Sequence, residues 1–407
     1  MRPRHTQHPL PSFPVYSCTF LSDNKVVLGG GGGATRSGIK NKLRLYEVTD
    51  TLEIHQMTEF ELEKGEDAPM SMAVHAESNT IVCGINSTEE KLEKGLNENC
   101  RIYTVNDSSI SPLRTQSTLP GGDLEDYQKV TVLSPDGSVL AVAGAHDLSL
   151  LSYPSLRPVA NPIHTEKEIY DVAFGANLLI VATTHNLLVY ELPSTSQPSS
   201  PTASKKKGKN KTSTVNGEKQ APSSLTLKKT VDLPSSLVGE GATFRSIRIH
   251  PSNDKVAYTL INTVPPRSRS KKTASRQGYA VKWNTDSWTP EKSRKIGDKG
   301  VTCFDISPNG RFLGFGSSDL SIGMVDATTL APCATILKAH EFPPTVIKFN
   351  PAGTLLVSGS ADNSIRVVSI PTTAANTGSS FWVVILCILI IILAFFVQVY
   401  LKSTNVI

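Results

Sequence analysis

The feature that most constrains the fold of this chain is a repeat with a period of 43 residues. The segment Gly316-Ser-Ser-Asp-Leu-Ser-Ile322 recurs as Gly359-Ser-Ala-Asp-Asn-Ser-Ile365, and the tetrad Ser307-Pro-Asn-Gly310 recurs at the same offset as Asn350-Pro-Ala-Gly353. Each tetrad lies between two runs with the alternation of β-strands. A period of this length, built from short strands, is typical of the blades of a β-propeller.

Weaker copies of both motifs extend the pattern upstream, for example Ser134-Pro-Asp-Gly137. Together they predict an all-β, seven-bladed propeller within residues 1–375, in which the apolar stretch before Tyr16 closes the ring against the last blade. A ring is needed because each four-stranded sheet leaves two apolar faces that only neighbouring blades can cover. The chain lacks the Trp-Asp dipeptide, so it resembles a divergent WD-repeat propeller. The predicted blades are at about 16–50, 68–107, 126–159, 168–194, 235–297, 299–338 and 342–371.

A second feature is the apolar segment Phe381 to Leu401, which contains no charged residue. As a helix it would be about 30 Å long, enough to cross the hydrocarbon core of a bilayer. Trp382 and Tyr400 stand near its ends, where amphipathic rings prefer the interface. We therefore expect a short linker at 376–380, a single transmembrane helix at 381–401 and a tail at 402–407.

The topology follows from the N-terminus, which has no apolar core of a signal peptide. The propeller is therefore expected to be cytosolic and the tail lumenal. The six cysteines include no C-x-x-C pair, which favours a reducing compartment over a disulfide framework or a zinc site.

Two segments interrupt the strand pattern, and both are basic. Residues 194–224 are rich in Ser, Thr, Pro and Lys and are predicted to be a disordered insertion, and residues 265–278 are predicted to be a basic loop. Without them the ring is mildly acidic. Solubilising insertions, contact with anionic lipid headgroups and nucleic-acid binding are alternative interpretations, although neither segment carries the aromatic residues that stack on bases.

The most unusual motif runs from Gly29 to Asn41, between an apolar run and the next expected strand, and we call it the glycine loop. It is neither a Walker A motif, because Ile39 stands where that motif needs Lys, nor a G-x-G-x-x-G motif. Consecutive glycines permit φ of either sign, let carbonyl groups converge on a cation and allow close approach of a partner. Composition alone would also permit a flexible hairpin tip.

The loop resembles that of the endoplasmic reticulum (ER) membrane guanine-nucleotide exchange factors for the Sar GTPase, the prolactin regulatory element-binding protein family, which starts assembly of the COPII coat. The residues that carry the resemblance are four glycines followed by Arg36, Ser37, Gly38, Ile39 and Asn41. Similar stretches at Glu59-Phe-Glu-Leu62, Asp67-Ala-Pro69 and Cys83-Gly-Ile-Asn86 extend the resemblance, which covers essentially the whole chain.

The resemblance implies a GTPase-contacting site and a bound potassium ion. Asn41 and Ile39 would press into the GTPase beside its nucleotide, and Pro69 would support this surface. The rest of the contacting loop would be Gly30, Gly31, Gly32, Gly33, Arg36, Ser37 and Gly38, with potassium held by backbone carbonyls within Gly30, Gly31, Gly32, Gly33 and Ala34. Such a factor acts without covalent chemistry, by binding the nucleotide-free GTPase better than the loaded one.

The expected partners are therefore a Sar-type small GTPase and the ER membrane, with no nucleic acid, and the oligomeric state stays open. The expected function is release of GDP from the GTPase at that membrane, to start coat assembly in ER-to-Golgi transport. No motif for a catalytic nucleophile or a metalloprotease is present. The main alternative is a non-catalytic, membrane-anchored scaffold for coat or contact-site proteins, and a nucleic-acid-binding regulator that uses the basic segments is a third.

Overall fold

The computed structural model describes residues 3–34, 37–120, 123, 125–192, 224–237, 241–263, 276–370, 386 and 388–392. The chain divides into two units, Met1–Ser369 and Ile370–Ile407. Outside the described residues lie the predicted insertion 194–224 except for its last residue, most of the basic loop 265–278, the linker 376–380, most of 381–401 and the tail 402–407.

Within the predicted transmembrane segment, residues 386 and 388–392 are helical and exposed. Among the residues that the model describes, no helix is both long enough and apolar enough to cross a membrane. The span at 381–401 thus stays a prediction.

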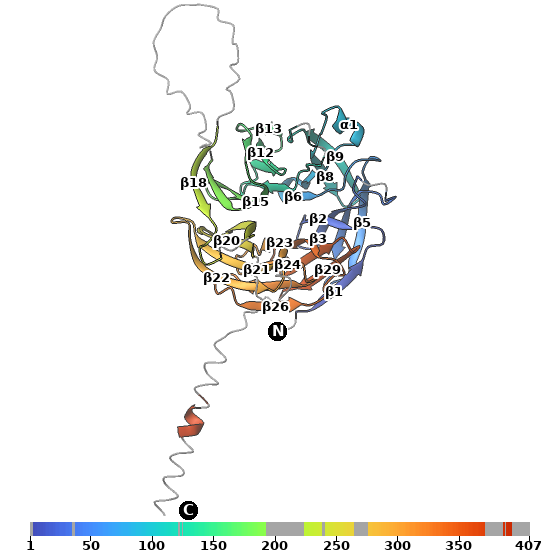
Figure 1. Cartoon of the computed structure of the whole chain (residues 1–407). Coiled ribbons are helices and arrows are strands. Elements are labelled where there is room, and N and C mark those ends of the chain that lie inside the picture. The colour runs from blue at the N-terminus through green and yellow to red at the C-terminus, as the bar shows by residue number, and fades with distance from the viewer. Residues whose placement is uncertain are drawn as a thin grey trace, which may run out of the picture. The chain divides into compact units, whose positions relative to one another are not determined.

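The first unit is a ring of seven antiparallel sheets, which confirms the predicted propeller (Figure 1). Blade 1 contains β2 (Val15–Phe20), β3 (Lys25–Gly30), β4 (Lys42–Val48) and β5 (Ile54–Glu61); blade 2 contains β6 (Ser71–His75), β7 (Thr80–Gly84), β8 (Cys100–Asn106) and β9 (Ser109–Gln116); blade 3 contains β10 (Val130–Leu133), β11 (Val139–Ala143), β12 (Asp147–Ser152), β13 (Arg157–Pro158) and β14 (Ile163–His164).

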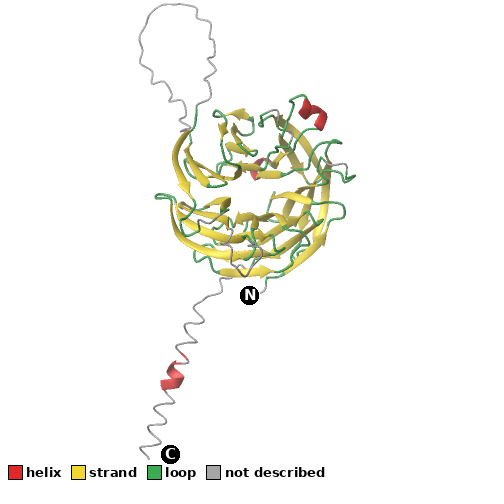
Figure 2. Cartoon of the chain, viewed as in Figure 1, coloured by secondary structure: helices red, strands yellow, loops and turns green. Residues whose placement is uncertain are grey.

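The remaining blades have the same construction. Blade 4 contains β15 (Ile169–Phe174), β16 (Leu178–Thr183), β17 (Asn186–Glu191) and β18 (Thr226–Asp232); blade 5 contains β19 (Thr243–His250), β20 (Asn253–Thr263), β21 (Gln277–Asn284) and β22 (Thr289–Gly297); blade 6 contains β23 (Val301–Ile306), β24 (Phe312–Ser317), β25 (Ile322–Asp326) and β26 (Pro332–Ile336); blade 7 contains β27 (Pro344–Phe349), β28 (Leu355–Ser360), β29 (Ser364–Ser369) and β1 (His5–Pro9). In the described part of the first unit, helices are short and lie in connections of blade 2, at η1 (Ala76–Ser78) and α1 (Glu89–Glu93) (Figure 2).

The ring closes where the N-terminal strand joins the last blade. β1 pairs antiparallel with β29, in the register His5 opposite Val368 and Pro9 opposite Ser364. Between this blade and blade 1, the buried Phe13 and Val15 share a core with Val357 and other residues of blade 7. The predicted closure by the apolar N-terminal stretch is therefore confirmed, and both ends of the propeller sequence stabilise the same sheet.

The repeated motifs occupy equivalent places in their blades. The tetrads at 134–137, 307–310 and 350–353 connect the first two strands of blades 3, 6 and 7, and each ends in a glycine of positive φ, +70°, +69° and +66°. In blade 7, the buried His340 lies with Nε2 2.8 Å from Ser358 Oγ and Nδ1 3.2 Å from the carboxylate of Asp362. The aspartate shared by the two strongest repeats therefore holds a buried histidine in one of them.

Besides the closing strand β1, four strands lie outside the predicted blades: the two-residue β14, beyond the predicted limits 126–159, and three outer strands. β5, β9 and β18 fall beyond the predicted limits 16–50, 68–107 and 168–194, so the predicted blades 1, 2 and 4 lacked their fourth strand. All three strands are largely exposed and have no regular burial alternation. A strand that pairs with the outer edge of a blade has few apolar positions, so its sequence carries little periodic signal.

Candidate functional site

The glycine loop connects β3 to β4 of blade 1 and lies on one face of the propeller. Its base is fixed by the strand register, which places Gly30 opposite Lys42. The next amide, the N–H of Gly31, donates to the carbonyl oxygen of Pro14 at 2.9 Å. The loop thus begins as a continuation of the sheet.

Two glycines show why this motif tolerates no side chain. Gly31 has φ of +141°, and a Cβ there would meet Asn41 Cα at 2.5 Å. A Cβ at Gly29 would lie 2.7 Å from the Cβ of Pro69 and 2.5 Å from Ser17 Oγ, whose hydroxyl donates to the Pro69 carbonyl at 2.6 Å. The buried Pro69 therefore packs directly under the glycine loop, where the sequence resemblance expected support.

The side chain of Asn41 is turned into the protein and fastens the loop. It is 8% exposed, and its Oδ1 accepts the N–H of Gly33 at 2.9 Å. Its Nδ2 donates to the carbonyl oxygens of Gly33 at 3.0 Å and Glu66 at 2.7 Å. Three of the four hydrogen bonds that an amide side chain offers are thus made within the chain.

The connection between β5 and β6 is the second wall of the site. Asn41 bonds its backbone at Glu66, and the Glu66 carboxylate receives Arg101 Nη1 of blade 2 at 2.6 Å. Both side chains are nearly buried, with exposures of 4% for Glu66 and 10% for Arg101. The glycine loop is therefore connected to the next blade through a charged pair that water hardly reaches.

Asp67 holds the far side of the loop. Its Oδ1 accepts the N–H of Ala34 at 3.0 Å and its own neighbour's N–H, that of Ala68, at 2.7 Å. Burial raises the pKa of Asp67, and the two N–H donors partly oppose this change. The carboxylate also lies close enough to Tyr16 for its charge to add to the burial that raises the pKa of that phenol.

The exposed tip of the loop is short. Ser37, Gly38 and Lys40 are exposed, and Ile39 is half-buried. Lys40 forms an exposed ion pair with Glu61 at 2.6 Å. Of the predicted site residues, Arg36 lies outside the described residues, and the structure brings together Gly30, Gly31, Gly32, Gly33, Ile39, Asn41 and Pro69.

Sequence reasoning missed four residues that hold the loop in place. Pro14, Glu66 and Asp67 bond directly to the loop, and Arg101 pairs with Glu66. Asp67 and Pro69 were present in one quoted stretch, but no signal in that stretch distinguished a loop-binding carboxylate from a surface one.

The expected potassium ion would have to use the oxygens beside the glycines. A Cβ built on Gly31 would lie 2.7 Å from the Lys40 carbonyl oxygen, one on Gly32 2.9 Å from that of Ile39, and one on Gly33 3.3 Å from Asp67 Oδ1, so each glycine leaves an oxygen within reach of its own open side. Within the described residues, no group of three or more His, Cys, Asp or Glu side chains could hold a metal. A cation at this loop would therefore depend on backbone and single side-chain oxygens, which is chemistry that potassium accepts.

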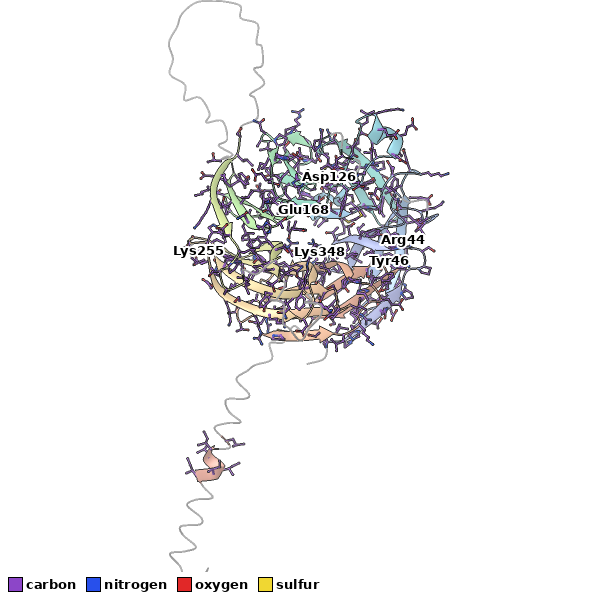
Figure 3. The ribbon with its side chains drawn as sticks, in the orientation of Figure 1. Arg44, Tyr46, Asp126, Glu168, Lys255 and Lys348 are labelled. Carbon is purple, nitrogen blue, oxygen red and sulfur yellow. The ribbon has the colours of Figure 1, made fainter. Side chains whose placement is uncertain are left out.

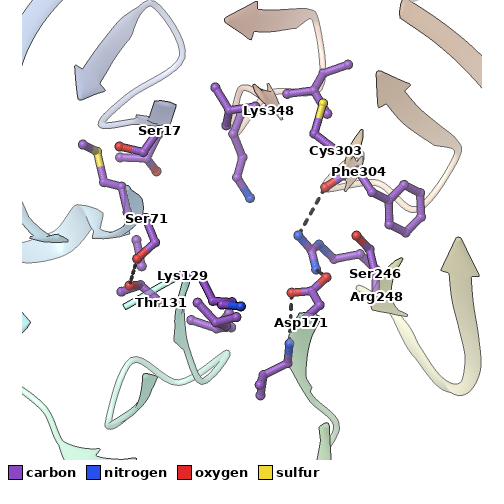
Figure 4. A pocket seen from close by; sticks show the side chains of 18 of the residues that line it. Ser17, Ser71, Lys129, Thr131, Asp171, Ser246, Arg248, Cys303, Phe304 and Lys348 are labelled. Carbon is purple, nitrogen blue, oxygen red and sulfur yellow. Dashed lines mark hydrogen bonds and ion pairs between the residues drawn. The ribbon is translucent and has the colours of Figure 1, made fainter. Parts of the chain in front are cut away.

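The ring encloses a central channel of about 490 Å³ lined by the innermost strands (Figure 4). Basic groups in it are mostly paired: Arg248 Nη1 binds Asp171 at 2.5 Å, and Lys348 binds Asp305 at 3.1 Å. Lys348 and Glu168 lie toward the middle of the ring, whereas Lys255 lies at its rim (Figure 3). The charges of Arg248 and Lys348 in the channel are thus compensated, whereas Arg245, which also lines it, has no such partner among the described residues.

Comparisons with family models and with solved structures agree with the propeller fold. A family model described as WD domain, G-beta repeat, matches residues 331–369. Chaetomium thermophilum Raptor superposes with a TM-score of 0.60 at 11% identity, over 91% of this chain and 29% of that one. At this identity the similarity shows the fold alone.

Relatives by sequence are more informative. Guanine nucleotide-exchange factor SEC12 of Candida glabrata is 25% identical over 384 residues, 92% of this chain and 74% of that protein. Putative guanine nucleotide-exchange factor SED4 of Saccharomyces cerevisiae is 22% identical over 398 residues, 96% of this chain but 33% of that protein. SEC12-like protein 2 of Arabidopsis thaliana is 23% identical over 363 residues, 85% of this chain and 76% of that protein. The predicted resemblance is thus confirmed, because nearly the whole chain is similar to a protein named guanine nucleotide-exchange factor SEC12, and similar proteins are named SED4 and SEC12-like protein 2.

Proposed function

We propose that this protein is a guanine-nucleotide exchange factor that releases GDP from a Sar-type small GTPase. The observation that carries the proposal is the clamped glycine loop, on a chain similar over 92% of its length to a protein named as such a factor. The proposed setting is the ER membrane, where the loaded GTPase would start COPII coat assembly for transport to the Golgi.

The geometry suits a protein that works by differential binding. An exchange factor must bind the nucleotide-free GTPase more tightly than the loaded form, since a ligand with equal affinity for both shifts nothing. A flexible loop would lose part of its binding energy in becoming ordered. The bonds that Asn41 and Asp67 make to the loop backbone fix its shape before the partner arrives.

This arrangement divides the predicted residues by role. Ile39 is the half-buried side chain at the exposed tip of the loop. It is proposed to press into the GTPase beside the nucleotide, where it would disturb phosphate and Mg²⁺ contacts. Asn41 is proposed as a positioning residue, because its amide groups are already engaged with Gly33 and Glu66.

A potassium ion is proposed to bind within Gly30–Ala34. When bound it would supply positive charge that draws carbonyl oxygens of the loop together. Asn41 and Asp67 would hold the loop around it through the hydrogen bonds that they make to Gly33 and Ala34.

The test is GDP release from a purified Sar-type GTPase, with catalytic amounts of the full chain in detergent, in potassium and in sodium. We expect rapid release with wild type, little with Asn41→Ala and slower release in sodium. Asn253→Ala, which removes an exposed amide at the start of β20 in blade 5, is the matched control and should behave as wild type. If the folded wild type leaves release at the intrinsic rate, the exchange function is wrong and the scaffold interpretation replaces it.

A further inference from the structure

The mouth of the central channel is a second surface on the same face as the glycine loop. It is a depression of about 380 Å³, and we call it the channel mouth. Its wall combines aromatic, proline and basic side chains from separate blades, among them Tyr16, Tyr127, Tyr170, Arg245 and Pro344. Tyrosine and arginine are the residue types that most often anchor protein interfaces.

The channel mouth is continuous with the glycine loop. Tyr16 lines the mouth and lies within electrostatic reach of Asp67, which accepts the N–H of Ala34 in the loop. Met70, at the end of the same β5–β6 connection, also lines the mouth. The β5–β6 connection therefore borders both the loop and the mouth, and one partner can contact both.

The charge of the mouth is not balanced. Lys129 and Glu168 form an ion pair at 2.6 Å, so their charges largely cancel. The guanidinium of Arg245 stacks 5.2 Å from the Tyr170 ring and donates to the Thr302 carbonyl at 3.2 Å. In the described part of the chain no acidic side chain lies within 4.0 Å of Arg245, although its charge also acts on Glu168. Lys129 and Arg245 thus share one acidic group in the mouth, which leaves a surplus of positive charge for an acidic partner.

Beside the mouth stands an exposed aromatic side chain on a rigid support. Phe342 is 58% exposed in the β26–β27 connection, next to the prolines that line the mouth. Its carbonyl accepts the hydroxyl of Ser360 at 3.0 Å, and the preceding N–H, that of Glu341, donates to Asp362 at 2.7 Å. The backbone that carries the Phe342 side chain is thus already ordered, so little conformational entropy is lost there when a partner binds.

We propose that the channel mouth with Phe342 is the second half of the GTPase interface, and that it receives a segment of the GTPase that presents an acidic and an apolar side chain. This inference rests on the proposed exchange function. Arg245 would pair with the acidic group and the aromatic wall would cover the apolar one. The glycine loop would then displace the nucleotide, and the mouth would supply affinity for the GTPase in all its states.

The division of labour predicts different kinetic effects. Uniform binding contributes to KM, whereas interactions made only with the nucleotide-free state contribute to kcat. Phe342→Ala and Arg245→Ala should each raise KM for the GTPase about 10-fold with little change in kcat, as expected for interface anchors. Arg245→Ala should also weaken the salt dependence of association, because it removes the uncompensated charge.

The experiment uses the full chain in detergent, with GDP release measured over a range of GTPase concentrations and the affinity for nucleotide-free GTPase measured by interferometry. Leu227→Ala, which truncates a leucine 48% exposed on the outer strand β18, is the matched control and should match wild type in both. Unchanged affinity and KM in both mouth variants would overturn the inference. If wild type releases no GDP, the exchange function fails, while the comparison of affinities still decides whether the mouth binds the GTPase.

Discussion

Removing the Arg101 side chain tests whether the buried pair under the glycine loop stabilises the site. Arg101 donates to the Glu66 carboxylate at 2.6 Å and, through Nε, to the Glu98 carbonyl at 2.9 Å. The other carboxylate oxygen of Glu66 accepts the N–H of Glu63 at 3.0 Å. In Arg101→Ala the Glu66 charge stays in a place that is 4% exposed but loses its positive partner.

Breaking a buried ion pair from one side costs about 3–5 kcal/mol, because an uncompensated charge is left behind. An exposed pair is worth about 0–1 kcal/mol. The chain offers such a pair in Lys94 and Glu90, with exposures of 61% and 80%. Arg101→Ala should therefore lower the free energy of unfolding several-fold more than Lys94→Ala.

The assay is urea unfolding of the full chain followed by tryptophan fluorescence, together with hydrogen exchange of the loop amides. Because the Glu66 carbonyl binds Asn41, we expect faster exchange at the N–H of Gly33 in Arg101→Ala. Adding Glu66→Gln should recover part of the lost stability, since it removes the orphaned charge. A loss no larger than that of Lys94→Ala, with unchanged exchange at Gly33, would refute the reasoning.

Two further predictions concern a buried histidine and a loop glycine. Burial lowers the pKa of His340, although the charge of Asp362 opposes this change. As the pH falls, the unfolded chain therefore binds a proton at this histidine before the folded chain does, and the free energy of unfolding should decrease below about pH 6.5. The urea midpoints at pH 8 and pH 5.5 should differ less in His340→Gln than in wild type. Gly31→Ala should lower the free energy of unfolding by about 1–3 kcal/mol and slow GDP release from the GTPase. Gly95→Ala, at φ of +73° with open space for the methyl group, should lose less stability in urea unfolding and leave GDP release unchanged.

How far the fold could be predicted depends on which strands carry a signal. The inner strands are buried on both faces and end in glycine turns, as at Gly310 and Gly353, so their repeat is visible in the sequence. The outer strands β5, β9 and β18 pair with one neighbour and face solvent, and β18 follows the long insertion of blade 4. Their sequences therefore contain no pattern that assigns them to a particular blade.

The candidate site divides in the same way. The glycine run is visible because backbone conformation at Gly31 restricts the residue type directly. The ion pair between Glu66 and Arg101 is not visible in the sequence, because the two residues are 35 positions apart, one in the connection between blades 1 and 2 and the other in β8 of blade 2. Only the stacking of blade 1 on blade 2 brings a carboxylate and a guanidinium to 2.6 Å, and nothing in their local sequence specifies that distance.

Strand order also determines which parts of the propeller share a face. In a four-stranded meander, the connection after the second strand and the connection to the next blade lie at the same end of the sheet. The glycine loop after β3 and the channel mouth at the β5–β6 and β26–β27 connections therefore share one face. The ends of β17 and β29 lie at the opposite end of the ring by the same argument. The proposed GTPase could thus cover the glycine loop and the mouth together without meeting the last residues of these two strands.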